Sequence, residues 1–388
     1  MTGRGLYGTS AAVGVGLVQY KRGTAPQGER GLLVRAMVAA CDDAGIDPAG
    51  IDGFVSYGND HNPPDQLMGE LGTRELHFSS MVWGAGGGGL LAAFEQAAMA
   101  IATGQAEVVA VYRAISQGTS GRLANAVIAH HVSDHAVAAG VVTPAIVCAL
   151  RAQRMLIEHD LQWSAIEALV QADYYHGSRN PEAVAYGKPL DLDTYRKGRK
   201  ITGPLRLYDC SRESDGAGVV LMTSTELARD LRKRPVYLLG AAHGAEKGWG
   251  NFIENDLDYA SSGFTSVARR LWDRTGLGPK DIDVTQLYEN FTPQAVVALV
   301  DHGLTSWETI AEDMIFENLI APNGRMPVNT DGGNLARGFV HGINIAVEAV
   351  RQLRGESSNS VPDARTCLVT GGPGSRMNSS AVFANEFE

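Results

Sequence analysis

The sequence lacks a long apolar run, has few cysteines and carries no excess of positive charge. A membrane-spanning helix needs roughly 18 or more apolar residues in a row, and the apolar stretch near the N-terminus, Ala11–Val18, is shorter and lacks the charged flank of a signal peptide. The 4 cysteines have neither metal-site nor disulfide-framework spacing. These absences predict a cytoplasmic protein in a reducing compartment.

The charge balance excludes another class of partner. The formal net charge is −10, whereas a nucleic-acid-binding face needs clustered basic residues. The hydrophobic fraction of 44% and the charged fraction of 20% are those of ordinary globular proteins. We therefore expect a folded chain that binds neither nucleic acid nor membrane.

Two stretches of the chain repeat one pattern of residues. Gly45-Ile46-Asp47-Pro48 leads to Ile51-Asp52 and then Tyr57, and Gly276-Leu277-Gly278-Pro279 leads to Ile282-Asp283 and then Tyr288. Each copy follows an apolar-periodic helix, breaks at Gly and Pro, and enters a short β-type segment. The chain is therefore predicted to be a duplication.

Each half also has a glycine-rich turn, an apolar helix and a strand in the same order, with Gly84–Gly89 before 90–103 and Gly332-Gly333 before 343–353. This order predicts two similar α/β layers with mostly parallel sheets. The predicted halves are residues 1–225 and 226–388, and the first contains an insertion at about 115–204. Within it, helices are expected at 145–159 and 164–175, the second capped by Ser164.

A series of motifs runs along nearly the whole chain: Asp43 to Ile46, Ile51 to Gly53, the turn at 84–89 with Ile101 and Gly104, Asn180-Pro181 with Ala183, Pro204-Leu205, Asp209-Cys210, Ser214 to Ala217, Tyr288 to Thr292, and Gly332 to Gly338. In their order and spacing these motifs resemble the thiolase superfamily, specifically its sterol-carrier-protein and lipid-transfer-protein branch. The resemblance implies duplicated βαβαβαββ halves in a five-layer arrangement, usually dimeric, acting on coenzyme A thioesters.

The chain departs from this resemblance in its chemistry. Thiolases place a nucleophilic cysteine at the glycine turn, but residues 84–89 contain only Gly and Ala. The histidine of the family falls on Phe339, and the region of the C-terminal cysteine reads Thr370-Gly371-Gly372-Pro373-Gly374. Without a nucleophile beside a base, no covalent acyl-enzyme forms.

A cysteine-free chain with Tyr288 in this motif resembles the lipid-transfer-protein-type aldolases of bacterial steroid side-chain degradation. The resemblance implies retro-aldol cleavage of a bulky β-hydroxyacyl-CoA to a ketone and a short acyl-CoA such as propionyl-CoA. It also implies a homodimer that binds an OB-fold and zinc-ribbon partner, giving a heterotetramer. Coenzyme A enters as part of the substrate, and no other cofactor is expected.

Retro-aldol chemistry needs a group that takes the hydroxyl proton and donors for the developing enolate. Tyr288 is the predicted proton-transfer residue, provided that its pKa, ordinarily near 10, is lowered. His341 is the predicted second acid/base. The alternative for each side chain is ordinary packing with its polar atoms hydrogen-bonded.

The thioester oxygen is predicted to bind the backbone N–H groups of Gly86, Gly87 and Gly88, together with Asn290, for which a loop cap is the alternative. Phe339, near where the aldolases have a second tyrosine, and His131 are predicted to line the substrate pocket. His131 and His135 lie one helical turn apart, but without the glutamate of a zinc-protease motif they predict no metal site.

Two questions stay open. The basic segment at 196–200 either binds coenzyme A phosphates or is a solvated loop. The chain is an aldolase, a catalytically inactive thiolase-like scaffold that binds coenzyme A, or a Claisen-type acyltransferase with an unrecognised nucleophile.

Overall fold

The computed structural model describes residues 5–83, 86–121, 134–246, 258–375 and 377–387. Their strands form one large mixed sheet in the order β3-β2-β4-β7-β1-β8-β11-β10-β9 and a small sheet of β5 and β6. His131 lies outside the described residues, so its predicted place in the substrate pocket stays a prediction. The first and last described residues lie close together, since the rings of Tyr7 and Phe387 meet edge-on with centroids 5.9 Å apart.

The first half contributes the strand order β3-β2-β4-β7-β1. Its elements are β1 (Ser10–Lys21), α1 (Glu29–Ala44), β2 (Gly53–Tyr57), α2 (Pro64–Leu71), β3 (Phe78–Val82), α3 (Leu90–Ala102), β4 (Val109–Ser116) and β7 (Ser214–Ser224). The short helix α9 (Thr225–Ala228) then leads to the second half.

The second half repeats this arrangement. Its main elements are β8 (Val236–Gly244), α10 (Thr265–Thr275), β9 (Val284–Gln286), α11 (Thr292–Asp301), α12 (Ile310–Asp313), α13 (Phe316–Leu319), α14 (Ile343–Arg354), β10 (Thr366–Gly371) and β11 (Asn378–Ala384). The counterpart of β3 is reduced to a single parallel bridge between Thr285 and Val328. Both halves therefore follow the predicted βαβαβαββ order.

The repeated sequence pattern corresponds to a repeated local structure. Helix α1 ends at Gly45 (φ 73°) and helix α10 ends at Gly276 (φ 72°), both in the left-handed conformation that favours glycine. A single 3₁₀ turn follows each helix, Pro48–Gly50 in the first half and Pro279–Asp281 in the second. Each turn then leads into the strand that precedes the repeated tyrosine.

The prediction of mostly parallel sheets is wrong. Parallel pairing occurs between β2 and β3, β2 and β4, and β9 and β10, whereas the other strand pairs of the large sheet are antiparallel. The last strand of each half, β7 or β11, runs antiparallel to both neighbours. For β11 the reason is its short connection to β10, because parallel pairing requires a long crossover.

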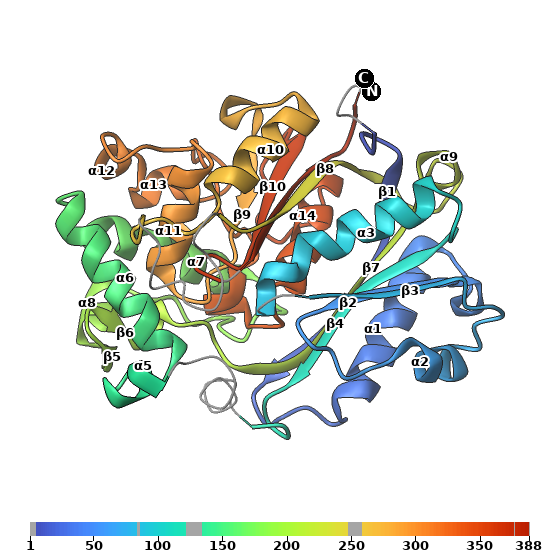
Figure 1. Cartoon of the computed structure of the whole chain (residues 1–388), viewed down its shortest axis with the longest axis horizontal. Coiled ribbons are helices and arrows are strands. Elements are labelled where there is room, and N and C mark those ends of the chain that lie inside the picture. Colours follow the sequence, from blue (N-terminus) through green and yellow to red (C-terminus); the bar gives the residue numbers. More distant parts are fainter. Residues whose placement is uncertain (1–4, 84–85, 122–133, 247–257, 376, 388) are drawn as a thin grey trace.

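Two helices form a central layer between the halves of the sheet (Figure 1). Helices α3 and α14 both contact strands of each half, whereas α1 packs on the first half and α10 on the second. Nearly every residue of α3 is buried, as expected for a helix that is covered on all sides. Its Phe94 packs edge-on against Phe383 of β11, with ring centroids 5.4 Å apart. The layers are therefore helix, sheet, helices, sheet and helix.

The insertion contains α5 (Asp134–Ala138), α6 (Pro144–Glu158), α7 (Ser164–Arg179), α8 (Leu192–Lys197), β5 (Lys200–Thr202) and β6 (Leu205–Arg206). Both predicted helices are present, but the predicted Ser164 cap is wrong. The N-cap residue of α7 is Trp163, without a side-chain hydrogen bond, and it is α6 that has a polar cap, Thr143. Helix α7 continues through Gly177. Glycine is required there because an added Cβ would lie 2.6 Å from the Ala336 Cβ.

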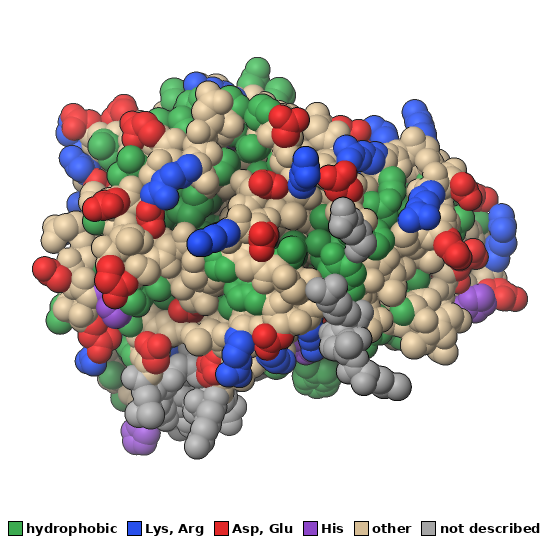
Figure 2. All heavy atoms as spheres, turned by 90° about the horizontal axis from the view of Figure 1, so that it is seen from above, with side chains coloured by type: hydrophobic (Ala, Val, Ile, Leu, Met, Phe, Trp, Pro, Cys, Tyr) green, Lys and Arg blue, Asp and Glu red, His purple; other side chains and the backbone are tan. Residues whose placement is uncertain are grey.

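Acidic and basic side chains alternate across the face shown in Figure 2, without a region of one sign. None of the helices within the described ranges is long and apolar enough to cross a bilayer.

Candidate active site

Residues from both halves meet where the two central helices begin. Tyr57 is the last residue of β2, and Tyr288 lies two residues beyond the end of β9. The glycine turn Gly86–Gly89 leads into α3, and His341 lies two residues before α14. The tyrosine of each half thus lies beside the start of the central helix of the other half, Tyr57 beside the start of α14 and Tyr288 beside the start of α3.

Tyr288 is held between two glycines. A Cβ on Gly87 would lie 2.1 Å from Tyr288 Cε2, and a Cβ on Gly342 would lie 2.5 Å from Tyr288 Cδ2. Gly342 also has φ 86°, a conformation that other residues rarely adopt. The ring is only 3% exposed. Both glycines are therefore required to seat this ring.

The surroundings of Tyr288 have opposing effects on the pKa of its phenol. Burial raises the pKa of its phenol, while the nearby Arg113 charge and a hydrogen bond with the Gly87 backbone lower that pKa. Burial is the larger effect, so the resting group is the neutral phenol. Among the described residues, no carbonyl or carboxylate accepts a hydrogen bond from its hydroxyl group.

His341 is fixed by two hydrogen-bond contacts. Its Nδ1 lies 3.0 Å from Arg113 Nε, and its carbonyl oxygen accepts a hydrogen bond of 2.9 Å from the Tyr57 hydroxyl. Its Nε2 lies 3.4 Å from the position of a Cβ on Gly86. The backbone is left-handed, with φ 51°. Burial and then the Arg113 charge hold the pKa of the imidazole well below its usual value, so the ring is neutral.

Phe339 separates the two polar groups. Its ring meets Tyr288 edge-on at 6.0 Å between centroids, and it meets His341 in the same manner at 5.2 Å. It is 4% exposed. The structure thus brings Tyr288, His341, Phe339, Gly86 and Gly87 together, as their predicted roles require.

Comparisons with known proteins agree with this architecture. Residues 245–385 match the family model "Thiolase C-terminal domain-like". The chain is 35% identical over 95% of its length to the 17-hydroxy-3-oxo-4-pregnene-20-carboxyl-CoA lyase of Mycobacterium tuberculosis, covering 97% of that protein. It is 34% identical over 95% of its length to a steroid side-chain-cleaving aldolase of Thermomonospora curvata, covering 96% of it.

The chain belongs to the thiolase-like aldolase family. A solved structure of this kind, titled "Ltp2-ChsH2(DUF35) aldolase", superposes with a TM-score of 0.91 at 32% identity, covering 99% of this chain and 100% of the other. The resemblance inferred from the motifs is therefore confirmed, and with it the thiolase-like fold.

Two residues essential to this arrangement were not predicted for the aldolase site. Arg113 of β4 and Asp60 form a buried ion pair of 2.7 Å, with side chains 6% and 0% exposed. Arg113 also donates to the Gly58 carbonyl at 3.0 Å. The signal was present in the sequence, because an arginine in the apolar segment 108–115 needs a buried partner.

Asn290 and Gly88 were predicted to bind the thioester oxygen, and the structure of this aldolase shows contacts of a different kind for both. The Asn290 side-chain oxygen accepts the Phe291 N–H at 2.9 Å, and its carbonyl accepts the Ser211 N–H at 3.0 Å. These are the contacts of a loop cap, the alternative considered for this residue. A Cβ on Gly88 would lie 1.9 Å from the Met377 carbonyl, so Gly88 allows the turn to pack against the C-terminal hairpin.

The residue after Tyr288 secures the loop that contains the double glycine. Glu289 accepts hydrogen bonds from the N–H groups of Asn334 and Leu335. Burial raises the pKa of both Glu289 and the neighbouring Asp173, and the two carboxyl groups hydrogen-bond each other. One shared proton therefore stabilises this pair beneath the candidate site.

The cysteines of this aldolase are unsuited to nucleophilic catalysis. Burial raises the pKa of Cys41, Cys148 and Cys210 to about 12 and also raises that of Cys367. The thiolate is the reactive form. These thiols are therefore protonated near neutral pH, which argues against the Claisen-type alternative.

The basic segment at 196–200 is partly neutralised. Arg196 forms an ion pair with Glu167 at 2.6 Å, and Lys197 forms one with Asp193 at 3.3 Å. Arg199 and Lys200 are exposed. These pairings favour the solvated-loop interpretation for the first two basic residues.

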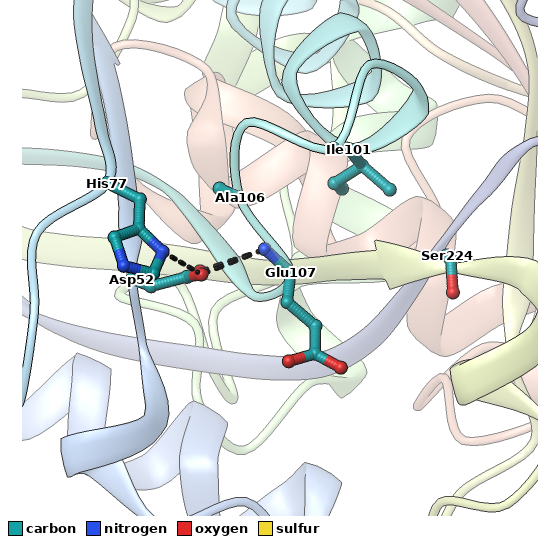
Figure 3. Close-up of a pocket in the computed structure, with 7 residues that line it drawn as sticks. Asp52, His77, Ile101, Ala106, Glu107 and Ser224 are labelled. Atoms are coloured by element: carbon teal, nitrogen blue, oxygen red, sulfur yellow. Dashed lines mark hydrogen bonds and ion pairs between the residues drawn. The ribbon is translucent and has the colours of Figure 1, made fainter.

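A surface hollow drawn in Figure 3 is lined by Asp52, His77 and Glu107, among others. Asp52 and His77 lie immediately before β2 and β3, and Glu107 lies two residues before β4. Asp52 accepts hydrogen bonds from the backbone N–H of Glu107 and lies 3.1 Å from His77 Nδ1. Because β2 begins at this hollow and ends at Tyr57, the hollow and the candidate site lie at opposite ends of the strand.

Proposed function

We propose that this chain cleaves a bulky β-hydroxyacyl-CoA with a steroid side chain by a retro-aldol reaction, releasing a ketone and a short acyl-CoA such as propionyl-CoA. It is a carbon–carbon lyase that acts on acyl-CoA thioesters. The main supporting observation is the buried phenol of Tyr288 against a glycine turn that offers no nucleophile. Two relatives named as a lyase and as a side-chain-cleaving aldolase, each about a third identical over nearly the full chain, support the same reaction.

The proposed reaction needs no covalent intermediate. The phenolate form of Tyr288 takes the β-hydroxyl proton and becomes the phenol, the bond between the α and β carbons breaks, and its electron pair forms the enolate of the shorter thioester. The β carbon becomes the ketone carbonyl. The proton then returns to the α carbon, so the reaction consumes no net proton.

Stabilisation of the enolate is the second requirement. Backbone N–H groups of the glycine turn at Gly86 to Gly88 are the proposed donors, because glycine lets a thioester approach the backbone closely. His341, predicted from the sequence as an acid/base, is the second polar side chain in this scheme. Its neutral imidazole is suited to hydrogen bonding near neutral pH.

The proposed assembly is a homodimer joined to an OB-fold and zinc-ribbon partner, with no cofactor apart from the coenzyme A of the substrate. A solved neighbour with a TM-score of 0.91 supports a partner, since its title pairs Ltp2 with ChsH2(DUF35). Purification of the chain with and without such a protein, followed by measurement of the complex mass, tests this assembly.

Mass spectrometry of the reaction products tests the proposed activity. The chain, alone and with the partner, is incubated with a steroid-type β-hydroxyacyl-CoA that carries a tertiary hydroxyl group. We expect propionyl-CoA and a 17-ketosteroid in equal amounts from the active sample and at least about 100-fold slower formation of both by a Tyr288→Phe control. Intact substrate in every sample, despite measurable substrate binding, would support the scaffold alternative.

A further inference from the structure

A buried arginine connects the end of one strand to the candidate site. Arg113 donates from Nη1 to Asp60 Oδ2 and to the Ala114 carbonyl, both at 2.7 Å, and from Nη2 to the Gly58 carbonyl at 3.0 Å. Its Nε–H points to His341 Nδ1 at 3.0 Å. Several fixed acceptors therefore set the plane of the guanidinium group.

Asp60 is equally constrained. Its Oδ1 accepts the backbone N–H of Asn62 at 2.8 Å, and its Oδ2 accepts the backbone N–H of Ala114 at 3.1 Å. Its side chain is 0% exposed. A carboxylate held in this way by two peptide groups is a fixed support for Arg113.

This arrangement decides which nitrogen of His341 carries the proton. A guanidinium group has donors and no acceptor, so His341 Nδ1 facing Arg113 Nε must act as the acceptor. The proton of a neutral imidazole is then on Nε2, the nitrogen that faces Gly86. The Tyr57 hydroxyl holds the His341 carbonyl at 2.9 Å and fixes the backbone behind the ring.

We propose that Asp60 and Arg113 are positioning residues that hold His341 as a neutral Nε2–H donor, which hydrogen-bonds the thioester oxygen of the bound acyl-CoA. This inference rests on the proposed function and deepens it, because it makes His341 a donor to the enolate oxygen rather than a base. Tyr288 is then the residue that exchanges the proton with the substrate, without a second acid/base. A preorganised donor of this kind acts most strongly on charge that develops in the transition state.

Imidazole ¹⁵N NMR of the full-length chain without substrate tests the tautomer independently of the aldolase activity. The His341 signal is assigned by its loss in His341→Gln. We expect one Nε2–H tautomer in the unaltered protein across pH 5.5–8. In Arg113→Lys, whose amine can still pair with Asp60, we expect a mixture of tautomers or a new protonation step. An Nδ1–H tautomer or an imidazolium at neutral pH in the unaltered protein would overturn the proposal.

The catalytic part of the proposal is tested by comparing two replacements of His341 on the cleaved substrate. His341→Phe should lower kcat by about 100-fold with little change in KM, as for a lost oxyanion donor, while His341→Gln, which keeps an N–H donor, should recover part of that loss. Equal loss in both variants would overturn the donor role. Absence of cleavage by the unaltered protein would count against the proposed function, whereas the NMR result would still decide the tautomer.

The pH profile gives a readout that a merely structural role would not change. The charged and titratable groups around His341 are Arg113 and, through it, Asp60, together with Tyr57 and Tyr288. Cleavage by the unaltered protein should show no inflection at the ordinary histidine pKa of about 6.5. The Arg113→Lys variant should show an inflection near this pH. The double variant with Arg113→Lys and His341→Gln should show none. An inflection in the unaltered enzyme that disappears in His341→Gln would contradict the proposal.

Discussion

The two repeated tyrosines, Tyr57 and Tyr288, follow equivalent strands but have different surroundings. The Tyr57 hydroxyl donates to the His341 carbonyl and therefore belongs to the scaffold. The Tyr288 ring is enclosed by Gly87 and Gly342, and its hydroxyl lies near the Gly87 backbone. The comparison shows that duplication supplies the position of a side chain, whereas the group opposite its polar atom decides its role.

The next position along the chain differs between the halves as well. Gly58 follows Tyr57 and offers its carbonyl to Arg113, whereas Glu289 follows Tyr288 and binds the backbone of the loop at 334–335. The first half thus supplies the support for His341. The second half supplies the proposed reacting phenol together with a buried carboxyl pair.

The largest expected difference between the two tyrosines is the effect on kcat of removing each hydroxyl group. Tyr288→Phe should reduce kcat by about 10²–10⁴-fold, the usual contribution of a positioned proton-transfer group. Tyr57→Phe should reduce kcat by less than tenfold and lower the free energy of unfolding by about 1 kcal/mol, because one buried hydrogen bond is lost. Steady-state kinetics and urea unfolding measure both. Equal kinetic losses would refute the division of roles.

Filling the space beside the Tyr288 ring should give the next largest loss of kcat. Gly87→Ala should reduce kcat by about 100-fold or more, because the added methyl group would lie 2.1 Å from Tyr288 Cε2 and displace the ring. Gly69→Ala, on helix α2 with no atom within 4 Å of the added Cβ, is the matched control. It should leave kcat unchanged and raise stability by about 0.5–1 kcal/mol. Normal kinetics in Gly87→Ala would show that the ring position is unimportant.

The raised pKa of Tyr288 predicts the pH dependence of cleavage. If the phenolate accepts the substrate proton, its fraction increases about tenfold per pH unit below the phenol pKa, so kcat/KM should rise about 100-fold between pH 7 and pH 9. Because burial raises this pKa above its ordinary value, no plateau is expected below about pH 10. A plateau between pH 7 and pH 8 would exclude Tyr288 as this base.

The carboxyl pair beside Tyr288 should give the smallest effect, on stability. The folded-state pKa of Glu289 is raised by burial, so the native state retains a proton that the unfolded state releases above about pH 4.3. The stability that this proton contributes is present at low pH and is lost as pH rises toward the folded-state pKa, by up to about 1.4 kcal/mol per pH unit.

Glu289→Gln provides the comparison, because it keeps an acceptor for the Asn334 N–H and cannot titrate. Urea unfolding between pH 5 and pH 8 should show a shallower decrease of stability with pH in the variant than in the unaltered protein. Buried carboxyl groups outside this pair contribute equally to both proteins and cancel in the difference, whereas Asp173, which shares the proton with Glu289, is part of the measured effect. Identical slopes would show that Glu289 is already ionised in the folded state.

The sequence alone determined the duplication, the thiolase-like fold and the loss of the nucleophile. The duplication depends on local signals, namely glycine and proline at helix ends and apolar periodicity. The thiolase-like fold, the missing nucleophile and the roles expected of Tyr288, Gly86, Gly87 and His341 followed from the resemblance of the motifs to the thiolase superfamily. The strand directions were not accessible, because β7 and β11 also pair with β1 and β8, strands that are far from them in the sequence.

Only the tertiary structure decided the partners of those residues. Asp60 and Arg113 are far from His341 along the chain, and nothing local in the sequence connects the strand that contains Arg113 to the loop before α14. The roles of Tyr57 and Tyr288 also diverge only when two distant segments are packed together. Burial and hydrogen-bond direction are properties of that packing, and they determine which nitrogen or oxygen carries a proton.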